Sequence, residues 1–395
     1  MATTGARKAQ GEEAGPVDNG TPAGNGATDL SNTAEKEGGS MGDTLLTLAT
    51  LAGRRRSEAQ EALLEKIAGL LADAQERTDK ERALIDDILV GLINDAQIAI
   101  RSRLAEQISH LGDPPPQLLD FLLADEAPVA GALIQRSPAV SEEALRAACG
   151  RSHGHRLAAA ARPGIDMPIS DLLVGHGEAD VTLTLLRNET ARLSQTVFAR
   201  IIATLGKEPA IAEALAARKD LSEALAHALF WGVAGPLRRR ILERFAVRPE
   251  DVDRVFETLA AEGYAGLKPA FDEVAVLGRD RLARFGPISR SLDFLRAGNI
   301  PDFAKDVARR LSISPQTIRR VLGDPGGEAM AVICKALDLD RSQFTSLFLL
   351  VDYRRRGEAR PAAHLDRIGA LFTELDREEA IATLTMWDRV EVVAV

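Results

Sequence analysis

The feature that most constrains this chain is a helical pattern that recurs about every 26 residues. The stretch from Asp125 to Leu145, DEAPVAGALIQRSPAVSEEAL, contains the pattern once. Its first predicted helix is built on four apolar residues: Val129, Ala130, Leu133 and Ile134. A break at Ser137-Pro138 follows, and a second helix begins at Ser141. Ser141 is a good N-cap because its hydroxyl can accept from a free amide of the first helical turn.

Successive break points lie 26, 26, 26 and 30 residues apart, at His110, Arg136, Arg162, Asn188 and Arg218. Four apolar-Ser dipeptides are predicted to open the helices that follow: Val140-Ser141, Ile169-Ser170, Leu193-Ser194 and Leu221-Ser222. Asn188 is expected to cap a helix or to bond a neighbouring loop. A fixed period in this range is typical of stacked helical hairpins, each burying its apolar face against its neighbours. The sequence therefore predicts an all-α fold: an α-solenoid-like, HEAT-like stack of short hairpins followed by a C-terminal helical block.

Composition limits the classes of function. A net charge of −9 and a pI near 5.4 argue against non-specific binding of nucleic acid or anionic membranes by the whole chain. Aromatic residues make up 4% and hydrophobic residues 45%, so the core is expected to consist of Ala, Leu, Val and Ile. The two cysteines, Cys149 and Cys334, indicate neither a disulfide framework nor a thiolate metal site. With no signal peptide or membrane span visible, we expect a cytoplasmic protein that does not bind a membrane.

Changes in composition divide the chain into four predicted parts. Residues 1–42 contain almost no large apolar side chains, which predicts a disordered N-terminal tail. A helical-repeat domain is predicted over residues 43–245. The stretch that begins at Arg248 marks a boundary, with Pro249 near the first turn of a new helix. A C-terminal helical domain over 246–350 and a helical extension over 351–395 complete the prediction.

Residues Val307 to Leu322, VARRLSISPQTIRRVL, resemble a helix-turn-helix unit. Ala308 stands where two helices must approach, Ser312 begins a tight turn, and the second helix begins at Pro315. In a DNA-binding protein the second helix would present four residues to bases or phosphates: Gln316, Thr317, Arg319 and Arg320. Residues 281–320 carry nine Lys or Arg against three Asp, so this segment is basic within an acidic chain.

The alternative interpretation of this segment is a continuation of the repeat. The sequence from Leu311 to Ile318 is echoed 26 residues later from Leu337 to Phe344. The second copy has Asp338 and Asp340 at its turn, where carboxylates would oppose nearby phosphates. The first copy has Ser312 where helix-turn-helix motifs usually carry Gly. We favour two more stacked hairpins and keep DNA contact as the alternative.

Signatures of catalysis are missing from the sequence. His153 and His155 are two residues apart and so lie on different helical faces, and we predict no metal site. No GxSxG, HExxH or phosphate-loop pattern occurs. The glycine-rich stretch from Gly323 to Gly327 lacks the Lys-Ser/Thr of a phosphate loop and is better explained as a turn. We predict a protein that is not an enzyme and holds no cofactor.

Over roughly residues 80–350 the chain resembles DUF2336, an uncharacterised bacterial family. The resemblance is carried by Asp125 to Leu145, by segments between Ile169 and Ala191, and by Phe303 to Leu350. The family is regarded as all-helical and has no established activity, so the resemblance implies no catalytic residues. Stacked hairpins present an extended surface suited to a helix or flexible peptide. We expect a scaffold or regulatory protein that binds another protein; the alternative is a transcriptional regulator that contacts DNA through residues 307–322.

Overall fold

The computed structural model describes residues 58–59, 61–62, 64–65, 79–269, 287–356 and 362–391. Their regular secondary structure is helical, apart from one isolated antiparallel bridge between Leu267 and Val390. The predicted all-α class is therefore confirmed. The predicted tail, residues 1–42, lies outside the described residues. Residues from Leu64 to Val395 form one compact unit, which contains everything discussed below.

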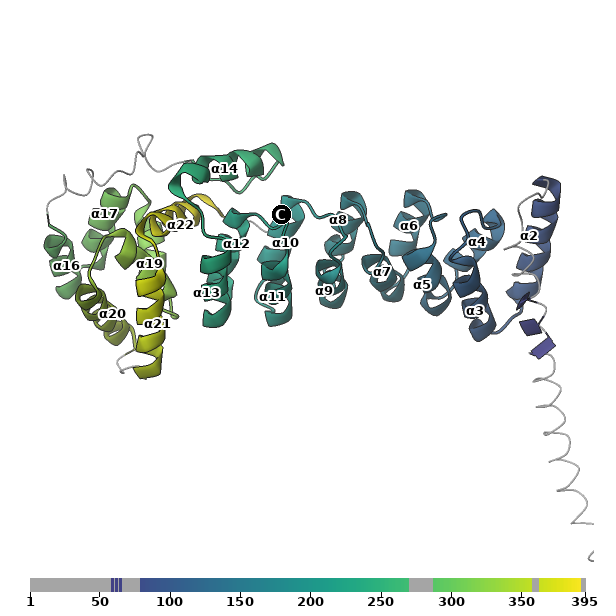
Figure 1. Ribbon diagram of the computed structural model, residues 1–395, viewed down its shortest axis with the longest axis horizontal. Helices are drawn as coiled ribbons and strands as arrows, with labels where there is room; N and C mark the ends of the chain where they lie inside the picture. The colour runs from purple at the N-terminus through teal and green to yellow at the C-terminus, as the bar shows by residue number, and fades with distance from the viewer. Residues whose placement is uncertain are drawn as a thin grey trace, which may run out of the picture. The chain divides into compact units, whose positions relative to one another are not determined.

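Two layers of helices make up the repeat region (Figure 1). Its helices are α2 (Asp79–Asn94), α3 (Ile98–Ile108), α4 (Pro116–Leu123), α5 (Ala127–Arg136), α6 (Glu142–Cys149), α7 (His153–Ala160), α8 (Met167–Gly175), α9 (Ala179–Arg187), α10 (Gln195–Leu205), α11 (Pro209–Ala217), α12 (Glu223–Leu229) and α13 (Gly235–Arg244). Each odd-numbered helix from α3 packs on the next odd-numbered one, and each even-numbered helix packs on the next even-numbered one. This contact pattern is typical of stacked helical hairpins.

The odd layer repeats with the predicted spacing. From α5 to α13 its helices begin at residues 127, 153, 179, 209 and 235, so successive starts differ by 26, 26, 30 and 26. In α5 the four predicted core residues are all buried. Residues at the same positions of α9, α11 and α13 are also buried: Val181, Thr182, Leu185 and Leu186; Ile211, Ala212, Leu215 and Ala216; Leu237, Arg238, Ile241 and Leu242. Such spacing places the four side chains on one face of a helix.

Serine caps open the even-layer helices at three of the four predicted places. The hydroxyls of Ser141, Ser194 and Ser222 accept from backbone amides three residues ahead. The fourth prediction was wrong, because Ser170 lies inside α8, with Asp166 at the N-cap and Pro168 in the first turn. Proline has no amide hydrogen to lose and a φ suited to a first turn, so this helix begins earlier than the serine signal indicated.

Long polar side chains at the break points bond one repeat to the previous one. The Arg162 guanidinium donates to the carbonyls of Ile134 and Ser137 at 2.6 and 2.9 Å. The Asn188 amide donates to the carbonyls of Ala160 and Arg162 at 3.0 and 2.7 Å. Arg218 and Arg244 continue the series onto carbonyls near the ends of α9 and α11. The last carbonyls of a helix have no partners inside that helix. These side chains donate hydrogen bonds to them and so link each repeat to the one before it. The predicted capping role of Asn188 is confirmed.

The rest of the chain folds around its last helix. The further elements are η1 (Phe230–Gly232), η2 (Pro249–Asp251), α14 (Val252–Ala261), α16 (Ser289–Arg296), α17 (Ile300–Leu311), α18 (Pro315–Leu322), α19 (Glu328–Ala336), α20 (Arg341–Arg356), α21 (Ala362–Glu374) and α22 (Arg377–Arg389). Helix α22 packs against two groups of elements: α12, η2 and α14, which come before the undescribed residues 270–286, and α18 and α19, which come after them. The boundaries predicted at 245/246 and 350/351 stay predictions, and α22 makes contacts across both.

The predicted echo between the two C-terminal hairpins extends to backbone conformation. Ser312 and Asp338, 26 residues apart, both adopt left-handed φ values, of 56° and 58°. Two residues after each, Ser314 and Asp340 cap the following helix. A left-handed residue is uncommon without glycine, and Asp is among the residues that tolerate it best. The α17–α18 and α19–α20 turns therefore share one geometry.

Candidate functional site

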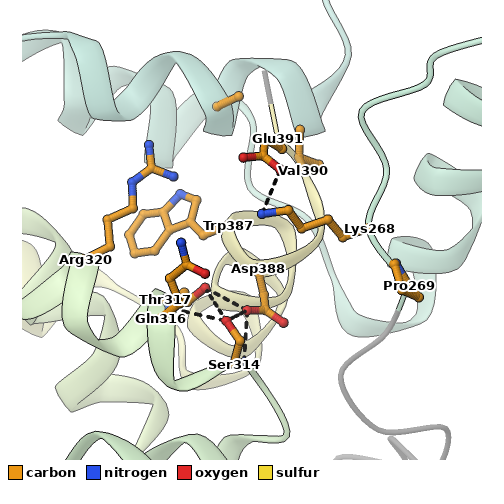
Figure 2. A pocket seen from close by; sticks show the side chains of 11 residues that line it. Lys268, Pro269, Ser314, Gln316, Thr317, Arg320, Trp387, Asp388, Val390 and Glu391 are labelled. Carbon is orange, nitrogen blue, oxygen red and sulfur yellow. Dashed lines mark hydrogen bonds and ion pairs between the residues drawn. The ribbon is translucent and has the colours of Figure 1, made fainter. Parts of the chain in front are cut away.

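A hollow beside α18 brings together three of the four residues that the sequence singled out. Gln316, Thr317 and Arg320 line this hollow of about 750 Å³, whereas Arg319 is exposed elsewhere on the helix. The other walls come from α12, from a segment after α14 and from the end of α22 (Figure 2). The remaining lining residues are Ala228, Lys268, Pro269, Ser314, Trp387, Asp388, Val390 and Glu391.

Asp388 from α22 occupies the N-terminus of α18. Its Oδ1 accepts from the Ser314 amide at 2.9 Å, from the Ser314 hydroxyl at 2.6 Å and from the Thr317 hydroxyl at 2.6 Å. A carboxylate is favourable there because a helix N-terminus carries partial positive charge. Thr317, a predicted DNA contact, is buried and gives its hydroxyl hydrogen to Asp388.

Residues 389 and 391, at and just after the end of α22, pair through their backbones with residues 266 and 268. The Lys268 amide donates to the Arg389 carbonyl at 2.8 Å, and the Glu391 amide donates to the Gly266 carbonyl at 2.9 Å. A Cβ on Gly266 would lie 2.2 Å from the Glu391 carbonyl oxygen, so this close approach needs glycine. Across the hollow, Lys268 Nζ and Glu391 Oε2 form an ion pair at 2.9 Å (Figure 2).

An aromatic cluster adjoins the hollow through Trp387, which lines it. The ring centroids of Trp231 and Trp387 are 4.9 Å apart, and those of Phe230 and Trp387 are 4.7 Å apart. The Arg320 guanidinium lies 4.1 Å from the Trp231 ring centroid. Arg320 is exposed as a residue, and partial desolvation of its guanidinium by the surrounding protein lowers its pKa. The chain has two tryptophans, far apart in sequence, and no sequence signal indicated that they meet.

His227 on α12 is fully buried at the edge of this cluster, with its ring centroid 6.5 Å from that of Trp387. Its Nε2 lies 2.9 Å from the Phe245 carbonyl, which fixes the neutral tautomer with the hydrogen on Nε2. Burial lowers the His227 pKa to about 4. The ring is therefore neutral in the folded protein at neutral pH.

Acidification is expected to destabilise the fold through His227. Below its unfolded pKa near 6.5 the unfolded chain binds this proton and the folded chain does not, so stability falls as the pH drops towards 4. Between about pH 7.5 and about pH 5 the loss from this group is about 2 kcal/mol. Urea unfolding at both pH values measures it. In His227→Gln, which keeps a donor for the Phe245 carbonyl, the pH dependence should be smaller by that amount; an unchanged dependence would refute the assignment.

The histidine pair considered for metal binding has other roles. His155 is buried in α7, with Nε2 at 3.0 Å from the Asp125 carbonyl. His153 is half exposed and lies beside two carboxylates, Glu178 and Asp180, at 3.3 and 2.8 Å. These carboxylates come from the next odd-layer repeat, so the sequence around the histidines gave no sign of them. Among the described residues no group of three His, Cys, Asp or Glu side chains could hold a metal ion.

Comparison with known proteins identifies one family. Its model, described as "Uncharacterised protein conserved in bacteria (DUF2336)", matches residues 129–385. No curated protein and no solved structure matches the chain. In the described part of the chain, every helix is too short or too polar to cross a membrane.

Proposed function

The chain belongs to the DUF2336 family of uncharacterised bacterial proteins, and from that premise we propose that it is a non-enzymatic, cytoplasmic scaffold that binds another protein through its even-layer helices. One observation carries the proposal. A helix of the chain itself, α22, packs on α12, the last even-layer helix of the array. The equivalent face of α6 and α8 is exposed.

Equivalent positions of α6 and α12 make the comparison direct, because both helices follow a capping serine. The second and fifth residues of α12 are Ala224 and His227, and both are fully buried. The second and fifth residues of α6 are Glu143 and Arg146, and both are exposed. In α8 the fifth residue, Asp171, is also exposed, and the first, Met167, is 48% exposed. Because α22 packs on α12 at the end of the array, the equivalent face of α6 and α8 is suited to packing a helix of a partner protein.

The open face combines charges of both signs with an exposed methionine. Side chains of this kind favour a partner helix with complementary charges and an apolar residue for contact with Met167. Charges at the edge of an interface contribute to partner choice and to the association rate. We therefore assign partner selection to Glu143, Arg146 and Asp171.

Charge reversal on this face tests the proposal. The variant Glu143→Arg, Arg146→Glu, Asp171→Arg should lose the proteins that the full chain captures from a bacterial lysate and should keep its helical circular dichroism. The control, Arg187→Glu with Lys219→Glu, changes exposed charges outside this face and should capture normally. Equal capture by the triple variant would remove the even-layer face from consideration.

DNA binding through α18 is the second candidate, favoured by the tight turn at Ser312 and the exposed side chain of Arg319. Two structural observations weigh against it. Asp388 occupies the N-terminus of α18, and Arg310 is buried with its Nε 2.9 Å from Asp306 Oδ2. Arg281 and Arg284, two of the nine basic residues in the segment 281–320, lie outside the described residues. Fluorescence anisotropy of labelled duplex at two salt concentrations, with the Arg319→Ala, Arg320→Ala variant, separates the candidates: DNA binding predicts affinity that falls with salt and with the substitutions.

A further inference from the structure

The hollow beside α18 has the size of a small-molecule site. Its volume of about 750 Å³ falls within the range of about 300–1,000 Å³ that is usual for ligand pockets. Its walls come from α12, α18, the 268–269 segment and the end of α22, so it lies where the repeat array meets the C-terminal helices.

Among the charged side chains of the hollow, Arg320 differs from the others in its partners. Asp388 accepts three hydrogen bonds at the N-terminus of α18. Lys268 and Glu391 pair with each other at 2.9 Å. Among the described residues that line the hollow, no carboxylate lies within ion-pair distance of Arg320, whose contact is with the face of Trp231. The two cations and two carboxylates of the lining balance in number, and Glu391 acts on Arg320 only at longer range.

The Arg320 Cζ atom lies over the Trp231 ring, 4.1 Å from its centroid. The face of the ring offers no oxygen to the guanidinium N–H donors, whose planar fork matches a carboxylate or a phosphate. Gln316 lies four residues before Arg320, one helical turn away on the same face of α18, and its exposed amide can donate as well. Figure 2 shows both side chains projecting from α18 on the side of Trp387.

We propose that the hollow binds a small oxyanion ligand, carrying a carboxylate or a phosphate group, through the Arg320 guanidinium and the Gln316 amide. The bound oxyanion would give Arg320 an ion-pair partner, and the remaining volume accommodates the rest of the ligand. This site is separate from the even-layer face assigned to the protein partner, so the two proposals stand or fall independently.

Intrinsic fluorescence reports on this site directly, because both tryptophans of the chain, Trp231 and Trp387, lie beside Arg320 or the hollow. The full-length protein is titrated with inorganic phosphate and, separately, with succinate, at constant ionic strength set with chloride. A saturable fluorescence change with either anion is expected, and the tighter of the two identifies the group that the site prefers. Calorimetric titration under the same conditions provides a second readout.

Variants of neighbouring arginines complete the test. Arg320→Lys keeps the charge but loses the fork and should bind about tenfold more weakly, and Arg320→Gln should bind still more weakly. The matched control is Arg319→Gln, next in sequence but outside the hollow, with unchanged affinity. Circular dichroism confirms that each variant is folded. No saturable binding of either anion, or equal binding by Arg320→Gln, would overturn the proposal; tighter binding of duplex DNA that depends on both arginines would replace it with the nucleic-acid alternative.

Discussion

Replacing Arg238 with Met is expected to lower the free energy of unfolding by about 3–5 kcal/mol, the usual cost of breaking a buried ion pair from one side. Arg238 lies in α13 at a position that is Ala130 in α5. Its Nη1 is 2.6 Å from Asp324 Oδ1 and 3.3 Å from Glu328 Oε2. All three side chains are at least 94% buried, so the substitution would leave two carboxylates in a poorly solvated site without this cation.

Urea unfolding followed by circular dichroism measures the loss. The control is Arg240→Met, an exposed arginine of the same helix, which should change stability by less than about 0.5 kcal/mol. In the Arg238→Met background, Asp324→Asn should cost less than it does in the natural protein, because the cation that favours the carboxylate is gone. Equal losses for Arg238→Met and Arg240→Met would show that the buried pair contributes nothing.

Replacing Trp387 with Ala is expected to lower the free energy of unfolding by about 3–5 kcal/mol. The indole is 4% exposed and packs on Phe230 and Trp231, at ring distances of 4.7 and 4.9 Å. These partners belong to the end of the repeat array, so the cavity would open where α22 holds the array and the C-terminal helices together.

Chemical denaturation of Trp387→Ala and Trp387→Phe distinguishes lost packing from a lost hydrogen bond. Among the described residues Nε1 of Trp387 has no partner, so Phe gives up ring volume but no hydrogen bond and should cost about half as much as Ala. If Phe were as damaging as Ala, the role of the indole would be polar. If neither substitution lowered stability, α22 would not be the central helix described above.

The features that sequence analysis predicted correctly are those that recur along the chain. In stacked hairpins, a residue meets its counterpart in the next repeat at nearly the same sequence separation each time. Arg162 and Asn188 each bond carbonyls 25–28 residues behind them. Such contacts leave a period in the sequence, and the period revealed the odd-layer helices, their buried faces, most of the serine caps and the capping role of Asn188.

The candidate site was predicted only in part, because most of its contacts occur once and leave no period in the sequence. Gln316, Thr317 and Arg320 attracted attention through a local motif, and the structure places them in one hollow. Their surroundings come from α22, which the sequence identified as a helix without indicating what it packs against.

By itself, the sequence determined the helices, their period and their inward faces, because local hydrogen bonding and repeat-to-repeat burial act over short, regular separations. The tertiary structure alone decided the single, non-recurring contacts. Arg238 meets Asp324 across 86 residues, and Asp388 meets Ser314 across 74. A contact made once at a long separation leaves no period in one sequence; its partners become recognisable only when the folded chain removes both from water and places them side by side.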